Sequence, residues 1–277
     1  MKKHFFCLAL ALVMCLGLMP GTAGALGVRV AGTELEDGYY SLSDGKVVAG
    51  TAESHHIHFE KDSGTLTLRD AAIAADTGES VILFTYEANN EKAVLNLIGQ
   101  NTISGSSFAI NAMDATGNIP SSSADVEAQL TINGQNGGGL TTSGTRWGIQ
   151  APNLTIDSVN LEMTTAGHSA LRIGRDLVIQ NSEITTKDSG DGGDFYVDRF
   201  IRFSDSIIDM SGINVEYPSI YLDNTHCPAE LKVSPAVVIE DSDLKIGGQK
   251  NSNLGFILYV VDGGADIMIS RIRHSPP

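Results

Sequence analysis

One pattern recurs along the chain at a nearly constant interval. It is an apolar pair flanking one other residue, and it stands at Leu130-Thr131-Ile132, Leu154-Thr155-Ile156, Leu177-Val178-Ile179 and Ile201-Arg202-Phe203. Alternation of this kind is typical of a strand that buries one face. A constant period on the order of two dozen residues indicates a solenoid whose turns stack on one another.

Each repeat carries three strand signals. In one repeat they fall at 154–156, 161–163 and 171–173, and the next repeat begins its own three at Leu177. Helical spacing and the asparagine-centred consensus of leucine-rich repeats are both missing. The sequence therefore predicts an all-β fold, a right-handed parallel β-helix with three short strands per turn of about 23–24 residues.

Alignment of the repeats predicts which residues stack. Two columns are apolar: Ile156, Ile179, Phe203 and Ile239 in one, Leu161, Ile184, Ile208 and Leu244 in the other. Between them run two further columns at a corner: Ser158, Asn181, Asp205 and Asp241, beside Val159, Ser182, Ser206 and Ser242. We expect the polar side chains to hydrogen-bond from turn to turn. We expect glycines to supply the turn conformations: Gly167, Gly190 and Gly212.

The segment at 1–25 differs in composition from the rest of the chain. Lys2 and Lys3 precede an apolar run, which ends before Ala23-Gly24-Ala25. This order is typical of a cleaved secretory signal, and the apolar run is short for a membrane span. We expect a signal peptide at 1–25 and one β-helix domain at 26–277, with an irregular N-terminal cap over about 26–92. The protein is thus expected to be secreted or held at the cell envelope.

Charge and cysteine content limit the classes of partner and the covalent links that this chain can have. Without residues 1–25 the chain has 16 basic and 33 acidic residues, a formal charge of −17. It offers no basic footprint for nucleic acid, and an anionic membrane surface is disfavoured. Only Cys227 remains of three cysteines, so no intramolecular disulfide is expected. We expect a monomer, with a surface loop carrying Tyr217, His226 and Cys227 as an insertion between repeats.

A family resemblance starts from an N-terminal run and covers most of the chain beyond residue 25. The run HFEKDSGTLTLRDAAI at 58–73 is followed by LNLIGQNTISG, LTINGQNGGGLTTSG and LTIDSVNLEMTTAG. This succession resembles the secreted β-helical carbohydrate-binding domain proteins of gut and cellulolytic Gram-positive bacteria. The resemblance implies a non-catalytic β-helix that binds polysaccharide, sometimes acidic polymers with the help of calcium.

Aromatic residues are the candidates for glycan contacts. Trp147, the only tryptophan, lies where a third strand begins and could stack on a sugar face. Tyr196, Tyr217 and Tyr221 fall on or near loops of adjacent turns and could extend that surface. A purely structural role for Trp147 stands as the alternative.

Acidic residues suggest a calcium site. Asp205 and Asp241 share a column, about 5 Å apart if the turns stack, where a cation would relieve their repulsion. The segment SGDGGDFYV at 189–197 resembles the calcium-binding nonapeptide of bacterial toxin repeats. It adds Asp191 and Asp194 as candidates, together with Asp188 just before it. Oxygen ligands suit Ca²⁺. The alternative is a solvated acidic face, and no other cofactor is expected.

An enzymatic function is weighed against binding because β-helices also host polysaccharide lyases and glycosidases. Gly167-His168-Ser169 matches the Gly-His-Gly segment of inverting pectin hydrolases only in part. Acidic residues in so acidic a chain do not by themselves indicate a catalytic pair. We therefore expect a non-catalytic polysaccharide-binding protein. A surface adhesin or structural module is the first alternative, and a lyase or glycosidase is the second.

Overall fold

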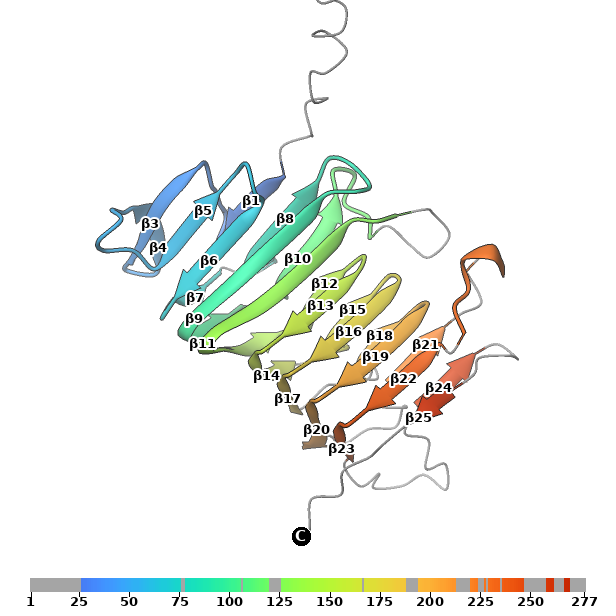
Figure 1. The fold of residues 1–277 in the computed structure, drawn as a ribbon. Coiled ribbons are helices and arrows are strands. Elements are labelled where there is room, and N and C mark those ends of the chain that lie inside the picture. Colours follow the sequence, from blue (N-terminus) through green and yellow to red (C-terminus); the bar gives the residue numbers. More distant parts are fainter. Residues whose placement is uncertain are drawn as a thin grey trace, which may run out of the picture.

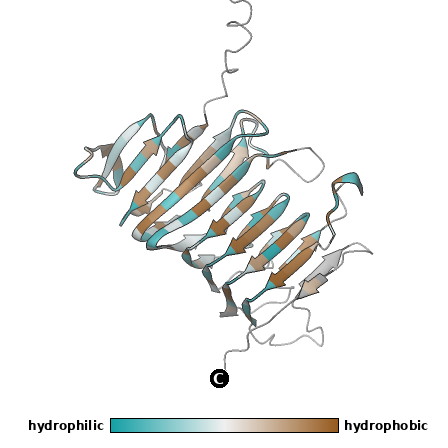
Figure 2. Cartoon of the chain, viewed as in Figure 1, coloured by the Kyte–Doolittle hydropathy of each residue, from teal (hydrophilic) through white to brown (hydrophobic). Residues whose placement is uncertain are grey.

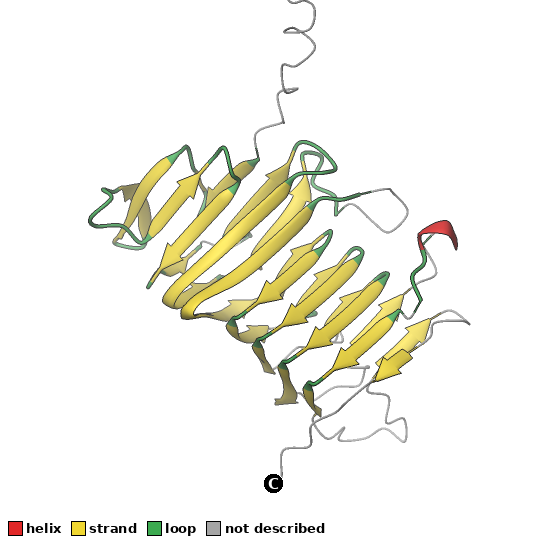
Figure 3. Cartoon of the chain, viewed as in Figure 1, coloured by secondary structure: helices red, strands yellow, loops and turns green. Residues whose placement is uncertain are grey.

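The structure is a computed structural model, and it is all-β. It describes residues 26–75, 78–105, 107–119, 126–165, 167–187, 194–212, 220–223, 227, 229–234, 236–246, 258–261 and 267–269. Every regular element in these ranges is a strand, except one 3₁₀ turn at Ala229–Leu231, η1 (Figure 3). Most strand pairs are parallel, as the sequence predicts. The described part contains no helix of the length and hydropathy that a membrane span needs.

The first of two sheets has nine strands stacked along the long axis of the molecule (Figure 1). In spatial order they are β2 (Thr33–Glu34), β1 (Gly27–Val30), β8 (Ile82–Tyr86), β10 (Phe108–Asp114), β12 (Trp147–Ala151), β15 (Leu171–Ile173), β18 (Phe195–Val197), β21 (Ile220–Asp223) and β24 (Leu258–Val261). Strand β1 is antiparallel to both neighbours. From β8 onward every pair in this sheet is parallel.

The second sheet has sixteen strands. Its main path runs through β4 (Lys46–Ala49), β3 (Gly38–Ser43), β5 (Ile57–Glu60), β6 (Thr65–Arg69), β9 (Lys92–Ser104), β11 (Gln129–Thr145), β13 (Leu154–Asp157), β16 (Asp176–Gln180), β19 (Phe200–Ser204), β22 (Val237–Glu240) and β25 (Ile267–Ile269). A side ladder leaves this path: β7 (Ala72–Ala74), β14 (Asn160–Thr165), β17 (Glu183–Lys187), β20 (Ile207–Gly212) and β23 (Asp243–Ile246). Strands β9 and β11 are long enough to pair in both parts. Antiparallel pairs occur only at the N-terminal end, among β3, β4, β5 and β6.

The interior columns follow the predicted register. Ile156 pairs with Ile179, Ile179 with Phe203, and Phe203 with Ile239, and none of these residues is more than 4% exposed. Leu161, Ile184 and Ile208 are fully buried in the second column, and Leu244 packs against the core from its end. Hydrophobic residues recur from strand to strand along this sheet (Figure 2). Both predicted apolar columns are therefore confirmed.

The polar column turns the chain between the main path and the side ladder. All four of its members adopt a left-handed backbone, with φ between 44° and 59°: Ser158, Asn181, Asp205 and Asp241. Asn and Asp tolerate this region because their short side chains can hydrogen-bond locally. The glycines predicted to supply turn conformations stand elsewhere in the repeat, at or after the end of the second strand of each unit. Gly167 has no left-handed φ, Gly212 belongs to β20, and Gly190 lies outside the described residues.

Asp157, at the end of β13, binds this corner to the next turn. Its carboxylate accepts hydrogen bonds from the amide nitrogens of Gln180 and Asn181 and from the hydroxyl of Ser158. Burial raises the pKa of Asp157, but these hydrogen bonds outweigh burial and hold the pKa below its ordinary value. The carboxylate form of Asp157 therefore supports the folded state.

A ladder of buried serines runs beside the corner, as the sequence predicts. The hydroxyl oxygen of Ser182 accepts the backbone N–H of Val159, that of Ser206 accepts the N–H of Ser182, and that of Ser242 accepts the N–H of Ser206. Each hydroxyl also donates to the carbonyl two residues before it. These bonds satisfy backbone groups that would otherwise be buried without partners.

The predicted surface insertion after β20 is partly wrong. Residues 220–223 form β21, in which Ile220 and Leu222 are buried and pair with Phe195 and Val197. Cys227 is only 4% exposed, so it does not lie on a surface loop. Tyr217 and His226 lie outside the described residues. The apolar alternation at Ile220 and Leu222 signals a strand, which gives this turn its third strand.

Candidate functional site

Six side chains on or next to successive strands of the nine-stranded sheet contact one another in series. We call this set the aromatic row: Phe108, Trp147, His168, Arg172, Tyr196 and Tyr221. The backbone register aligns Phe108 with Trp147, and it aligns Arg172 with Tyr196 and Tyr196 with Tyr221. Their neighbours Leu171, Phe195 and Val197 point inward and are buried. The structure thus brings together three of the four predicted glycan contacts, while Tyr217 lies outside the described residues.

Trp147 is stacked on both sides. Its ring lies 5.8 Å from that of Phe108 at 11°, and 4.0 Å from that of His168 at 8°. Phe108 belongs to β10 and His168 precedes β15, the two strands that flank β12, so the two rings approach opposite faces of the indole. Trp147 therefore presents an edge to solvent. A sugar cannot stack on its face in this arrangement, contrary to the use that the sequence suggests.

The two tyrosines continue the row on strands rather than on loops. The rings of Tyr196 in β18 and Tyr221 in β21 stack at 4.9 Å and 17°. The hydroxyl of Tyr196 donates to the carboxylate of Asp223 at 3.0 Å. Burial, with this hydrogen bond, raises the pKa of Tyr196 well above its ordinary value. The phenol therefore stays protonated across the physiological range.

Arg172 links the two aromatic groups. Its Cζ lies 5.6 Å from the ring centroids of both Trp147 and Tyr196, within the range of cation–π attraction. The side chain is exposed, and among the described residues it makes no ion pair. Arg172 therefore presents a positioned guanidinium with hydrogen-bond donors to solvent. Buried Gln150 and Asn111, hydrogen-bonded to each other at 3.2 Å, precede it in the same register column.

Of the predicted calcium ligands, Asp205 and Asp241 lie on adjacent turns as expected, but Asp194 does not join them. Asp205 is exposed and Asp241 half-buried at the corner before the side ladder. Asp194 is fully buried immediately before β18, a strand of the other sheet, and Asp188 and Asp191 lie outside the described residues. The described residues hold no group of three His, Cys, Asp or Glu side chains that suits a metal ion. Two aspartates alone supply fewer oxygens than the six to eight or so that Ca²⁺ takes.

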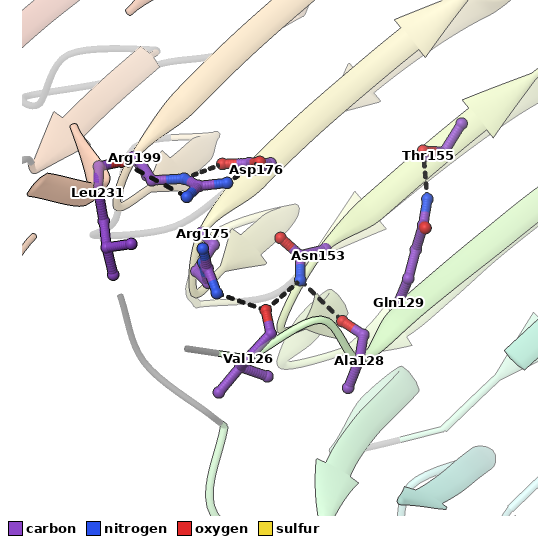
Figure 4. Close-up of polar contacts among 9 residues, drawn as sticks. All are labelled: Val126, Ala128, Gln129, Asn153, Thr155, Arg175, Asp176, Arg199 and Leu231. Carbon is purple, nitrogen blue, oxygen red and sulfur yellow. Dashed lines mark hydrogen bonds and ion pairs between the residues drawn. The ribbon is translucent and has the colours of Figure 1, made fainter. Parts of the chain in front are cut away.

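A second site, which the sequence did not reveal, lies at the corner between the two sheets (Figure 4). It is a pocket of about 330 Å³, which we call the corner pocket. It is lined by Val126, Glu127, Gln129, Asn153, Leu154, Thr155, Arg175, Asp176, Val178 and Arg199. These residues begin β11, β13, β16 and β19 or stand just before them, so four successive turns build the pocket.

Hydrogen bonds fix the polar walls of the corner pocket. The guanidinium of Arg199 binds both carboxylate oxygens of Asp176 from Nε and Nη2, in fork geometry (Figure 4). Buried Arg175 donates from Nη1 to the carbonyl of Val126. The amide of Asn153 donates to the carbonyls of Val126 and Ala128 at 3.3 and 2.8 Å.

One sequence signal could have indicated this pocket. Arg175 and Arg199 are separated by one repeat, and the N–H of Arg199 donates to the carbonyl of Arg175. Equal spacing places two arginines in one column, where like charges need a counter-charge. Asp176, next to Arg175, provides it for Arg199. The segment at 126–128, which completes the pocket, lies before β11 and is not predicted by the repeat.

Comparisons with known proteins identify no relative. No protein-family model matches the chain, and neither a curated protein nor a solved structure matches it. The two sites are therefore interpreted from their own chemistry.

Proposed function

We propose that this chain is a secreted right-handed parallel β-helix that binds polysaccharide along the aromatic row without cleaving it. The observation that carries the proposal is the series of contacting side chains that crosses β10, β12, β15, β18 and β21, with a step of three residues along the strands between Trp147 and Arg172. At about 4.8 Å per strand, four steps extend for roughly 19 Å. A series of this length suits a polymer chain better than a small compact ligand.

The chemistry of the row is amphipathic. Ring edges of Phe108 and Trp147 offer apolar contact, while the hydroxyl of Tyr221 and the guanidinium of Arg172 offer hydrogen bonds. Because the rings stack on one another, their positions are fixed before a ligand arrives, and little side-chain entropy is lost on binding. These features support recognition of sugar edges and hydroxyl groups rather than stacking on a ring face.

The absence of catalysis belongs to the proposal. In the aromatic row the described titratable groups are His168, Arg172 and two tyrosines, and two carboxylates act on Tyr196: Asp223, which accepts its hydroxyl, and Asp198. A glycosidase would need two carboxyl groups facing each other across the scissile bond. We expect no release of reducing ends or of unsaturated products from polygalacturonate or xylan. Release that a single Asp or Arg substitution abolishes would contradict the proposal.

Binding is tested by affinity electrophoresis of the purified protein in gels that contain neutral or acidic polysaccharides. We expect Arg172→Gln to weaken retardation by the polymer that binds best by about tenfold, because a charge-assisted donor is lost. The matched control is Arg202→Gln. Arg202 is equally exposed on a strand, but it lies in β19 of the other sheet and pairs with Glu240. If both variants bind as the wild type does, the row is not the binding surface.

A further inference from the structure

We infer that the corner pocket is a binding site for one neutral, hexose-sized sugar unit. The pocket is separate from the aromatic row. Its walls come from the starts of β11, β13, β16 and β19, whereas the row follows the strands of the other sheet. The inference therefore goes beyond the proposed function, and binding of a free monosaccharide in the pocket does not require polymer binding by the row.

The size of the corner pocket sets the size of the ligand. A volume of about 330 Å³ lies at the lower end of the range of roughly 300–1,000 Å³ that small-molecule sites occupy. A single sugar ring fits that volume, and a disaccharide would extend out of it. The half-buried side chain of Val178 gives the lining an apolar part against which a ring can lie, while Leu154 is buried in the core.

The hydrogen-bonding groups of the pocket suit hydroxyls. The amide oxygens of Gln129 and Asn153 and the carboxylate of Glu127 accept no hydrogen bond from another described residue. Their nitrogens, by contrast, are engaged: Gln129 donates to the hydroxyl of Thr155 at 2.8 Å, and Asn153 donates to two carbonyls (Figure 4). The engaged nitrogens fix the orientation of each amide. Several fixed acceptors in one small pocket favour a ligand that carries several donors, as a sugar does.

The charges of the pocket favour a neutral ligand. Its lining contains two arginines, Arg175 and Arg199, and two acids, Glu127 and Asp176. Asp176 and Arg199 form a bidentate pair with side chains 26% and 14% exposed, so neither is readily available to a ligand charge. The chain as a whole carries −15, which repels anions at long range. A carboxylate-bearing sugar would also meet Glu127.

The pocket lies close to the aromatic row along the chain. Arg175 follows Arg172 by three residues, and Arg199 follows Tyr196 by three, which is at most about 11 Å of extended chain. One glycan chain is thus able to reach both sites, with an end or a branch in the pocket. Titrations with a free hexose and with a short oligomer of the same sugar distinguish binding of a single sugar from binding of a chain end or branch.

The test is titration calorimetry or saturation-transfer NMR with galactose, glucose and their uronic acids at physiological salt. We expect one of the two hexoses to bind at least about tenfold more tightly than its uronic acid. Glu127→Ala should weaken hexose binding about tenfold, because a charged acceptor is lost, and should strengthen uronate binding, because a like charge is lost. The control is Glu183→Ala, an equally exposed glutamate of β17 in the side ladder, which should change neither.

Four results would overturn the inference. They are tighter binding of the uronic acid, no binding of either hexose, a Glu127→Ala variant that behaves like Glu183→Ala, and unchanged hexose binding when Gln129→Ala removes a fixed acceptor. The Arg172→Gln variant separates the two proposals. If it loses polymer binding but keeps hexose binding, each site stands by itself, whereas loss of hexose binding would show that the pocket is not an independent site.

Discussion

Replacing Ser206 by alanine should destabilise the protein by about 2–3 kcal/mol. Ser206 is 3% exposed, and its hydroxyl accepts the backbone N–H of Ser182 at 3.2 Å and donates to the carbonyl of Ser204 at 2.7 Å. Alanine removes both hydrogen bonds, each with a net contribution of about 0.5–1.5 kcal/mol. It also leaves the N–H of Ser182 buried without its acceptor, and that penalty brings the total to the upper part of the sum.

The free energy of unfolding is measured by urea unfolding followed by circular dichroism, for wild type, Ser206→Ala and a matched control. One m-value is used for all three proteins. The control is Ser204→Ala, because Ser204 is a half-exposed neighbour whose hydroxyl makes no hydrogen bond with another described residue. It should stay within about 0.5 kcal/mol of wild type. If Ser206→Ala is no less stable than Ser204→Ala, the serine ladder does not hold the turns together.

Further predictions concern the core and the corner. Ile179→Asp should lower the free energy of unfolding by several kcal/mol, because it buries an unpaired charge at a position with no exposure. If the variant unfolds at the same urea concentration as wild type, Ile179 is not a core residue. Asp205→Val should cost about 1–2 kcal/mol and Asp205→Asn almost nothing, because φ is 48° there, so equal stabilities would contradict the left-handed corner. If calcium binds at this corner, it should raise the melting temperature of wild type but not that of the Asp205→Asn, Asp241→Asn double variant. The measurement is thermal unfolding of each protein with calcium and with chelator. An equal response of the two proteins would place any bound calcium elsewhere. The pKa of Asp157 is lower in the folded state than in the unfolded state. Its contribution to stability is therefore present above the unfolded pKa of about 3.9 and is lost as pH falls through the folded pKa, so wild type should lose more stability in acid than Asp157→Asn. Parallel curves of unfolding free energy against pH for the two proteins would refute this.

The interior of the fold could be predicted from the sequence because strand geometry leaves few choices. Side chains alternate with a period of two, so a register slip of one residue would turn a whole apolar column to solvent. Together with the nearly constant repeat length, that constraint aligns Ile156, Ile179, Phe203 and Ile239 in one way only. The backbone conformation at the corner was harder to predict from the sequence, because glycine, aspartate and asparagine all adopt the left-handed region.

The two candidate sites depend on contacts that the repeat does not encode. Sequence alone placed Trp147, Tyr196 and Tyr221 on neighbouring turns, but only the structure shows that Phe108 and His168 cover the faces of Trp147. Those contacts are set by rotamers and by the turns that precede each strand. They cannot be read from the order of apolar and polar residues, which is all that the repeat pattern gives.

The corner pocket shows the same division. The repeat by itself puts Arg175 and Arg199 in one column, and it determines the backbone path that brings them together. It does not specify the segment at 126–128, where the Val126 carbonyl accepts hydrogen bonds from Asn153 and Arg175, 27 and 49 residues away in sequence. A repeat fixes what each turn shares with the next, through backbone hydrogen bonds and interior packing. A pocket arises where one turn departs from the others, and the position of such a segment is decided by tertiary contacts.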